Sequence, residues 1–191
     1  MRVGVLALQG DFREHIAALN AIGVDSIPVK TELEINAVDA LVLPGGESTT
    51  IAKLARVFGV FDLIKSKINS GLPVYGSCAG LILLADRILD GVAGQETFGG
   101  LDITARRNAF GRQVDSFEGE IEFVGLGKLN GVFIRAPWVE EVGSGVEILA
   151  TSHGHPVAVR QESILATSFH PELTNDYAVH RYFVEELCKA R

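Results

Sequence analysis

Short apolar runs alternate with amphipathic segments through the first half of the chain. Val3–Leu8 is apolar almost throughout, as expected of a strand that is buried on both faces. Phe12–Ile22 has the spacing of a helix, with Asp11 placed to cap it and Gly23 to end it. Repeated strand–helix units of this kind predict a parallel sheet with helices on both faces. The further strands expected here are Ser26–Lys30, Ala40–Leu43 and Leu72–Tyr75, and the further helices are Ser48–Phe58, Phe61–Asn69 and Leu81–Ile88.

The second half of the chain has a different pattern. Gly100–Phe169 is rich in β-branched and aromatic residues with frequent glycines, which is typical of short, partly antiparallel strands. A last helix is expected over Tyr177–Lys189. We therefore predict an α/β fold, a single domain over residues 1–191 with a mixed, mostly parallel open sheet and extra hairpins. The strands expected in this half are Ile103–Arg106, Gly119–Phe123, Val132–Arg135, Glu147–Thr151, Val157–Gln161 and Ile164–Phe169.

Composition and charge narrow the class of protein. A chain of 191 residues suits one compact domain with a substantial core. The formal net charge of −7 argues against nucleic acid and anionic membrane surfaces as partners, and no apolar run approaches the length of a membrane span. Cys78 and Cys188 make no disulfide framework, so a reducing cytoplasm fits best. Cys188, on the last expected helix, is interpreted as structural or incidental.

A nucleophile elbow is the most informative local pattern. Gly76-Ser77-Cys78-Ala79-Gly80 stands between an expected strand and an expected helix. A thiol at such a turn is pushed out of the sheet, and the helix that follows points its unpaired N–H groups at the sulfur, which favours the reactive thiolate. Gly76 and Gly80 let the strand and the helix approach each other closely. The alternative is a small buried core residue, which is how most cysteines behave.

A second motif favours the interpretation of Cys78 as a nucleophile over that of a core residue. His170 lies at the end of an expected strand, and Pro171 biases it toward an extended backbone. Glu172, two positions on, then faces the same side and can orient the imidazole. Taken singly, His170 is a strand-end histidine and Glu172 a surface carboxylate. Together with Cys78 they fit the pattern of nucleophile, base and orienting group.

The candidate motifs are expected to converge at one edge of the sheet. Gln9-Gly10, Gly45-Gly46, Cys78, Arg135 and His170 each follow a strand, and ligands bind beyond the carboxyl ends of such strands. A backbone N–H of the Gly45-Gly46 loop can face an oxyanion there together with that of Ala79. The alternative is a tight turn with a helix cap, and the two roles are compatible. The spacing of a phosphate loop is absent.

Several motifs carry a family resemblance. Gly76–Gly80 together with Phe169–Glu172 resembles the triad-type, class I glutamine amidotransferases. Further motifs narrow the resemblance to the glutaminase subunits of pyridoxal 5′-phosphate synthases, and the match covers essentially the whole chain. The departures from the family pattern are minor: Ala109 and Ser77 stand where serine and threonine are common. The further motifs are Leu8–Asp11 with Arg13–His15, Pro44–Thr50, Arg107–Phe117, Phe133–Pro137 and His170–Thr174, of which Arg107–Phe117 is the specific one.

This resemblance implies a flavodoxin-like amidotransferase fold and a hydrolase that converts L-glutamine to L-glutamate and ammonia. Cys78 is the implied nucleophile, His170 the general base and acid, and Glu172 the group that holds the imidazole. Gly46 and Ala79 are assigned to the oxyanion hole, and no metal or cofactor is expected. Arg107 suits the substrate carboxylate because guanidinium binds it in a planar fork. The glutamine contacts that the resemblance implies are Gly46, Glu47, Ser48, Arg107, Ile134 and Arg135.

The resemblance also implies a partner. The chain has one sheet's worth of residues, so the enzyme that uses the ammonia is expected to be a separate polypeptide. In the family this partner is the synthase subunit. It is a (β/α)8 barrel that takes up ammonia through its interior, in a large cytoplasmic hetero-oligomer. Two other classes remain open: a different hydrolase on the same scaffold, such as a cysteine peptidase or another glutaminase, and a binding module with an inactive site.

The remaining histidines and the tryptophan have plainer interpretations. His15 and His180 lie on expected helices and are interpreted as solvated. His153 and His155 flank Gly154 in an expected hairpin turn, and no cysteine or carboxylate set accompanies them as a metal site would need. Trp138 is interpreted as core or loop packing.

Overall fold

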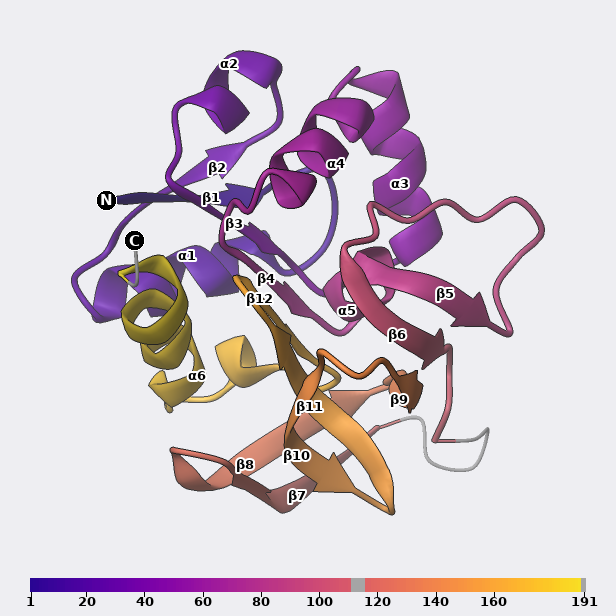
Figure 1. Cartoon of the computed structure of the whole chain (residues 1–191). Helices are drawn as coiled ribbons and strands as arrows, with labels where there is room; N and C mark the ends of the chain where they lie inside the picture. The colour runs from indigo at the N-terminus through magenta and orange to yellow at the C-terminus, as the bar shows by residue number, and fades with distance from the viewer. Residues whose placement is uncertain (111–115, 190–191) are drawn as a thin grey trace.

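The chain folds around a central sheet of seven strands in the order β10-β11-β12-β4-β3-β1-β2 (Figure 1). The computed structural model describes residues 1–110 and 116–189. Five adjacent strands of the sheet are parallel, and the β10–β11 hairpin extends one edge antiparallel. The parallel strands are β1 (Arg2–Leu6), β2 (Asp25–Val29), β3 (Ala40–Leu43), β4 (Val74–Ser77) and β12 (Ile164–Thr167), and the hairpin is β10 (Glu147–Ser152) and β11 (His155–Gln161).

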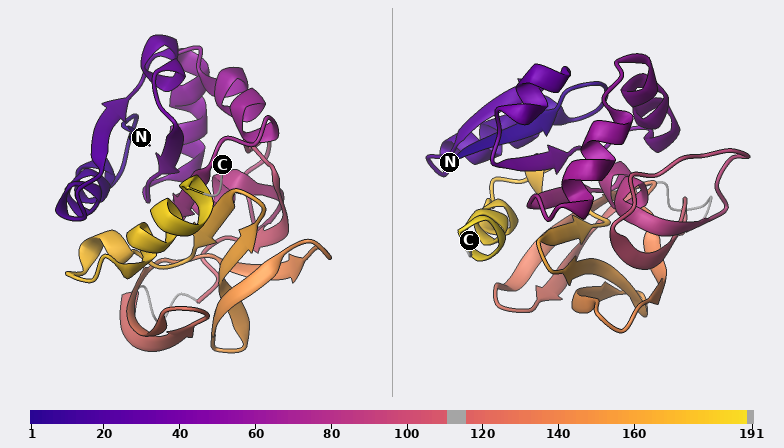
Figure 2. Two further views of the ribbon diagram at one scale, coloured as in Figure 1. Left: turned by 60° about the vertical axis from the view of Figure 1, so that its left-hand side comes forward. Right: turned by 45° about the horizontal axis from the view of Figure 1, so that its top comes forward.

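Helices cover both faces of this sheet (Figure 2). Alternate residues of a strand point to opposite faces, so Leu41 and Leu43 of β3 pack in one apolar core and Val42 in the other. The first core includes Ile51 of α3, and the second includes Leu19 of α1. The helices are α1 (Phe12–Ala21), α2 (Glu32–Asn36), α3 (Ser48–Val57), α4 (Phe61–Asn69), α5 (Ala79–Leu84) and α6 (Ala178–Tyr182), which continues as a π-helical turn over Phe183–Cys188. Among the described residues, no helix has both the length and the apolar character needed to span a membrane.

Two smaller sheets flank the central one. β5 (Ala85–Leu89) and β9 (Trp138–Val142) pair with opposite edges of β6 (Leu101–Arg106). β7 (Ser116–Phe123) and β8 (Gly127–Ile134) form an antiparallel hairpin. The backbone N–H of His170 donates to the Val132 carbonyl at 2.9 Å, which ties β8 to the end of β12.

The predicted fold class is confirmed, and most predicted elements agree with the structure within about two residues. The expected helix Leu81–Ile88 is wrong in its second half, because α5 ends at Leu84 and Ala85–Leu89 is strand β5. The expected helix Tyr177–Lys189 is split into α6 and the π-helical turn. α2 and β9 were not predicted. Residues 111–115 of the Arg107–Phe117 motif lie outside the described residues.

The elbow depends on two glycines. A Cβ atom on Gly76 would lie 2.6 Å from the Gly80 carbonyl carbon, and a Cβ atom on Gly80 would overlap the Leu43 carbonyl oxygen. These contacts join β4, α5 and β3 at the level of their backbones. The close approach predicted from the sequence is therefore present, and it leaves no room for a side chain.

We expect Gly80→Ala to destabilise the chain by about 1–3 kcal/mol or more, because the added methyl group overlaps backbone atoms. Elsewhere in a helix a change from glycine to alanine is stabilising by about 1 kcal/mol. The sign of the change in unfolding free energy therefore tests the close packing at Gly80. Gly145→Ala is the matched control, since its Cβ would have open space around it. Denaturant unfolding of both variants is the measurement, and a Gly80→Ala variant at least as stable as the native chain contradicts the close packing.

Candidate active site

Cys78 occupies the turn between β4 and α5 in a strained conformation. Its φ of 49° and ψ of −99° lie outside the regions that non-glycine residues favour, at a cost of about 1–3 kcal/mol. The Cys78 N–H donates to the Thr167 carbonyl at 2.7 Å, which holds the turn against β12. Cys78 is 7% exposed, and its Sγ lies 3.9 Å from the Ile134 carbonyl oxygen. The sulfur therefore faces the space beyond the carboxyl ends of the strands.

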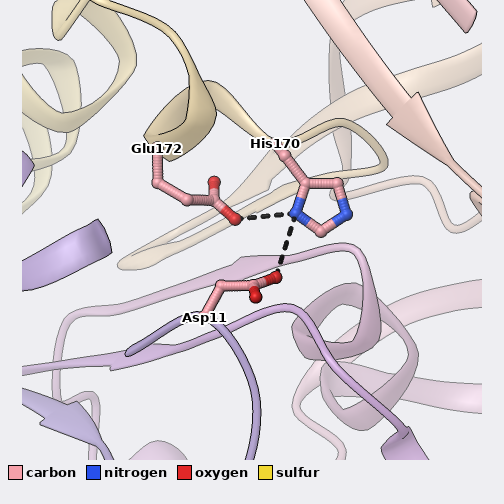
Figure 3. A group of neighbouring side chains, drawn as sticks. All are labelled: Asp11, His170 and Glu172. Carbon is pink, nitrogen blue, oxygen red and sulfur yellow. Dashed lines mark hydrogen bonds and ion pairs between the residues drawn. The ribbon is translucent and has the colours of Figure 1, made fainter. Parts of the chain in front are cut away.

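His170 and Glu172 form a buried pair (Figure 3). Nδ1 of His170 lies 2.7 Å from Oε1 of Glu172, whose side chain is completely buried. The contact was predicted, but the backbone that makes it was not. β12 ends at Thr167, and Pro171–Leu173 forms a 3-10 turn instead of continuing as extended chain. The turn folds Glu172 back beneath the imidazole.

Electrostatics keep this pair charged. Burial lowers the pKa of His170, but hydrogen bonds with Cys78 and Glu172 outweigh burial and raise that pKa to about 10. Burial raises the pKa of Glu172, but His15 and His170 outweigh it and hold that pKa well below its usual range. At neutral pH the site contains an imidazolium and a carboxylate.

Asp11 lies on the other side of the imidazole. Its Oδ2 is 3.7 Å from Nδ1 of His170, and its side chain is 41% exposed. The expectation that Asp11 caps α1 is wrong, because its side chain makes no cap hydrogen bond. Burial raises the pKa of Asp11, and His170 opposes that effect.

Ligand atoms of Asp11, His170 and Glu172 lie within 4.8 Å of one another, the one group of three or more metal-ligating residues found among residues 1–110 and 116–189. A cation there would have to displace the proton that Nδ1 of His170 shares with Glu172. The arrangement therefore suits proton transfer better than metal binding.

One pocket beside the sulfur contains every residue assigned from the sequence to glutamine contacts or the oxyanion hole. Ile82 and Asn108 also line this pocket, which the sequence did not predict. A larger hollow between Gly125 and α6 includes none of Cys78, His170 and Glu172. The residues brought together with Cys78 are Gly46, Glu47, Ser48, Ala79, Arg107, Ile134 and Arg135.

Arg107 is held in the pocket by two partners. Its Nη2 lies 2.9 Å from Oε1 of Glu47, and its Nη1 donates to Oε1 of Gln95 at 2.7 Å. Gln95 donates in turn to Oγ of Ser48 at 2.9 Å. The side chain of Arg107 is 12% exposed, so its guanidinium is oriented before any ligand arrives. Gln95 was missed because nothing in its local sequence marks it.

The loop at Gly45 and Gly46 is packed against the loop after β1. The Asp11 N–H donates to the Gly45 carbonyl at 3.1 Å, and Oε1 of Gln9 accepts from the Glu47 N–H at 2.8 Å. A Cβ atom on Gly45 would overlap the imidazole of His170. Glu47 also caps α3 through the Thr49 N–H, so the turn-and-cap interpretation holds beside any role in binding.

The expectation that His15 and His180 are solvated is wrong. Both are completely buried, and Nε2 of His15 lies 2.9 Å from Oγ of Ser77 and 3.4 Å from Oε1 of Glu172. A signal was present in the sequence: His15 shares the apolar face of α1 with Ala18 and Leu19, three and four positions on.

His153 and Trp138 agree with their predictions, whereas the interpretation of His155 as a turn residue is wrong because it is paired with Ser152 in the sheet. His153 and Gly154 form the turn between β10 and β11. His155 opens β11 and stacks on Trp138, with ring centroids 3.7 Å apart, so Trp138 is a packing residue.

The charge on His170 makes stability depend on pH. Because its pKa is raised from 6.5 to about 10, the folded chain holds this proton more tightly than the unfolded chain. The contribution to stability is complete below about pH 6.5 and is lost as the pH rises through about 10. Glu172→Gln removes the partner carboxylate, so we expect this variant to have a lower free energy of unfolding than the native chain. The difference between the two should shrink as the pH rises from about 6.5 to about 10. Denaturant unfolding at a series of pH values measures it, with Glu122→Gln at an exposed site as the control; a deficit that stays constant contradicts the ion pair.

Comparison with known proteins agrees with this geometry. Residues 5–189 match the model of the SNO glutamine amidotransferase family. The chain is 60% identical over 190 residues to the pyridoxal 5′-phosphate synthase subunit PdxT of Mycolicibacterium vanbaalenii, covering 97% of each chain. It is 59% identical over 184 residues to the protein of that name from Mycobacteroides abscessus, covering 96% and 95%.

Solved structures share the fold. A crystal structure of a glutamine amidotransferase superposes with a TM-score of 0.92 at 51% identity, covering 97% of this chain and 98% of that one. A glutamine amidotransferase from Thermotoga maritima has a TM-score of 0.63 at 16% identity, covering 97% and 84%, which shows the fold alone. The chain belongs to the SNO glutamine amidotransferase family.

Proposed function

We propose that the chain is the glutaminase subunit of a pyridoxal 5′-phosphate synthase and that residues 1–191 form one catalytic domain. The observation that carries the proposal is the buried His170–Glu172 pair, which lies at the same edge of the sheet as a cysteine at a strained elbow. The family match and the relatives named as synthase subunits support it. Cys78, His170 and Glu172 act as the catalytic triad.

The raised pKa of His170 favours its role as the first base. His170 takes up the thiol proton of Cys78, and the sulfur attacks the side-chain amide carbon of glutamine. The carbon–nitrogen bond breaks as His170 protonates the departing ammonia, which leaves a glutamyl thioester. Water, activated by the now neutral His170, attacks the thioester carbon. Glutamate departs, and the proton taken from water restores the imidazolium.

Backbone N–H groups stabilise the negative oxygen that forms in each step. Ala79 opens α5 immediately after the nucleophile, and Gly46 lines the same pocket. Removing one such donor costs about 2.7–4 kcal/mol of transition-state stabilisation in a well-studied protease. These two donors form the oxyanion hole.

Recognition of glutamine uses the charged groups at the far side of the pocket. Arg107 takes the α-carboxylate in its planar fork, and Glu47, which already faces Arg107, takes the α-ammonium. Ser48, Ile134 and Arg135 complete the contacts, with backbone groups at Ile134 and Arg135 as suitable as side chains.

The ammonia goes to a separate synthase subunit, in keeping with the names of the relatives. We propose that this partner is a (β/α)8 barrel, that the two proteins form a large hetero-oligomer, and that the assembly works in the cytoplasm. The chain needs no cofactor of its own, since the chemistry requires only the triad, backbone donors and water.

Cys78→Ala, assayed in complex with the synthase partner, tests this function. We expect pyridoxal phosphate to form from ammonium salts but not from glutamine, and glutamine hydrolysis to fall by about 10⁴-fold or more. Cys188→Ala is the control and keeps both activities. Glutamine use by Cys78→Ala contradicts the nucleophile. A native chain that hydrolyses glutamine but supports no pyridoxal phosphate formation contradicts the partner, and hydrolysis of peptide amides instead of glutamine favours another hydrolase.

Arg107→Lys tests substrate recognition. Lysine keeps the charge but cannot make the planar, two-pronged contact with a carboxylate. We expect KM for glutamine to rise by about tenfold or more, with a smaller change in kcat. Arg106→Lys is the control, because Arg106 pairs with Asp90 and Glu140 outside the pocket. An unchanged KM would remove Arg107 from the binding site.

A further inference from the structure

A line of buried polar side chains continues from the triad into the interior. Nε2 of His15 lies 3.4 Å from Oε1 of Glu172, and its Nδ1 lies 2.9 Å from Nε2 of His180. His15 is on α1 and His180 on α6, 165 residues apart, and both rings are completely buried. The mechanism above uses neither ring, and polar groups at this depth require a reason.

The surroundings select one arrangement of protons. Nε2 of His15 lies 2.9 Å from Oγ of Ser77 and 3.4 Å from Oε1 of Glu172. A bare Nε2 would set a lone pair against that carboxylate, so Nε2 carries the hydrogen and donates to the Ser77 hydroxyl beside the carboxylate. Nδ1 of His15 then accepts from the Nε2–H of His180. The remaining Nδ1 of His180 has no partner among the described residues, and a bare nitrogen is tolerated there better than a buried N–H.

His180 is neutral for an independent reason. Burial is the largest effect on this group, and its pKa is lowered to about 3. Both rings also meet Tyr75 edge-on, with centroids 5.7 Å and 5.8 Å away. The rings are therefore fixed in orientation as well as in protonation.

We propose that His15 is a positioning residue of the catalytic site, with His180 setting its tautomer. This inference rests on the proposed function. Oε1 of Glu172 accepts from Nδ1 of His170 and from the Ser77 hydroxyl at 3.5 Å, and Nε2 of His15 lies 3.4 Å from the same oxygen. Oε2 has no partner among the described residues, so His15, directly and through Ser77, restricts rotation of the carboxylate.

Restricting the rotation of Glu172 matters because His170 has a second acceptor within reach. Oδ2 of Asp11 is 3.7 Å from the same Nδ1 that Glu172 holds at 2.7 Å. If Glu172 rotates away, His170 can turn toward Asp11 and lose its alignment with the Cys78 sulfur. His15 therefore keeps the imidazole on Glu172, which affects turnover and leaves glutamine binding unchanged.

The test compares His15→Leu, which removes the donor, with His15→Gln, which places an amide N–H near the same position. We expect kcat for glutamine hydrolysis to fall about tenfold to a hundredfold in His15→Leu, with KM little changed, and to recover largely in His15→Gln. The low-field proton resonance of the His170 Nδ1–H should weaken or shift in His15→Leu and return in His15→Gln. Leu19→Ala is the matched control: it removes buried volume one turn further along α1, so it lowers stability but leaves kcat and the resonance unchanged.

A folded His15→Leu with the native kcat and resonance overturns the proposal, and so does a loss of kcat that His15→Gln does not restore. If neither variant folds, the tautomers of His15 and His180 in the native chain test the proposal. Nitrogen-15 NMR of labelled histidines should show His15 and His180 neutral with the proton on Nε2, and a proton on Nδ1 of His15 overturns the proposal. A native chain without glutaminase activity overturns the proposed function instead, and the histidine tautomers are still read independently.

Discussion

The buried carboxylate of Glu172 is the constraint on which the geometry of the site depends. A carboxylate removed from water is very costly unless donors surround it. Here the donors come from three parts of the chain: His170 after β12, His15 on α1 and Ser77 at the end of β4. These segments must be in place before the charge can be buried, and the charge then holds them there. The same contact raises the pKa of His170, so the interaction that organises the fold locally also sets the protonation state for chemistry.

The parallel sheet explains why these segments meet. In the register of the sheet Thr167 lies opposite Ser77, and Leu43 lies opposite Gly76, so β12, β4 and β3 end at one level. Whatever follows those strands is presented at the same edge. The close contact of Gly80 with Leu43 fixes α5 at that edge, and strain at Cys78 is tolerated because the strands beneath it are fully buried.

Local patterns were readable from the sequence, and long-range relations were not. The strand–helix alternation, the elbow at Cys78 and the His170-Pro171-Glu172 motif are encoded within a few residues, and they predicted the fold class and the proposed triad. β5 was missed because Ala85–Leu89 follows the apolar run of α5 without a turn signal and its short sequence, with Asp86 and Arg87, fits a helix as well as a strand. Pairing with β6 makes it a strand. His15 and His180 were assigned to solvent from their polarity. The burial of His15 had a local signal in the apolar face of α1, but the pairing of the two rings follows from the packing of α1 beside α6, which no local window contains.

The chemical identity of the supporting residues follows from the same balance of charge. Glu172 and His170 already form one buried ion pair, and a third buried charge without its own partner would cost several kcal/mol. A lysine or arginine in place of His15 would bring such a charge and would compete with His170 for the carboxylate. A neutral imidazole has an N–H on one side and an acceptor nitrogen on the other, so His15 supports Glu172 without adding charge. Its acceptor nitrogen then needs a donor, which His180 supplies. The chain of hydrogen bonds ends at Nδ1 of His180, which has no partner among the described residues and carries no hydrogen in this arrangement. A pair of neutral histidines is therefore well suited to holding a buried carboxylate still while its partner imidazole gains and loses protons.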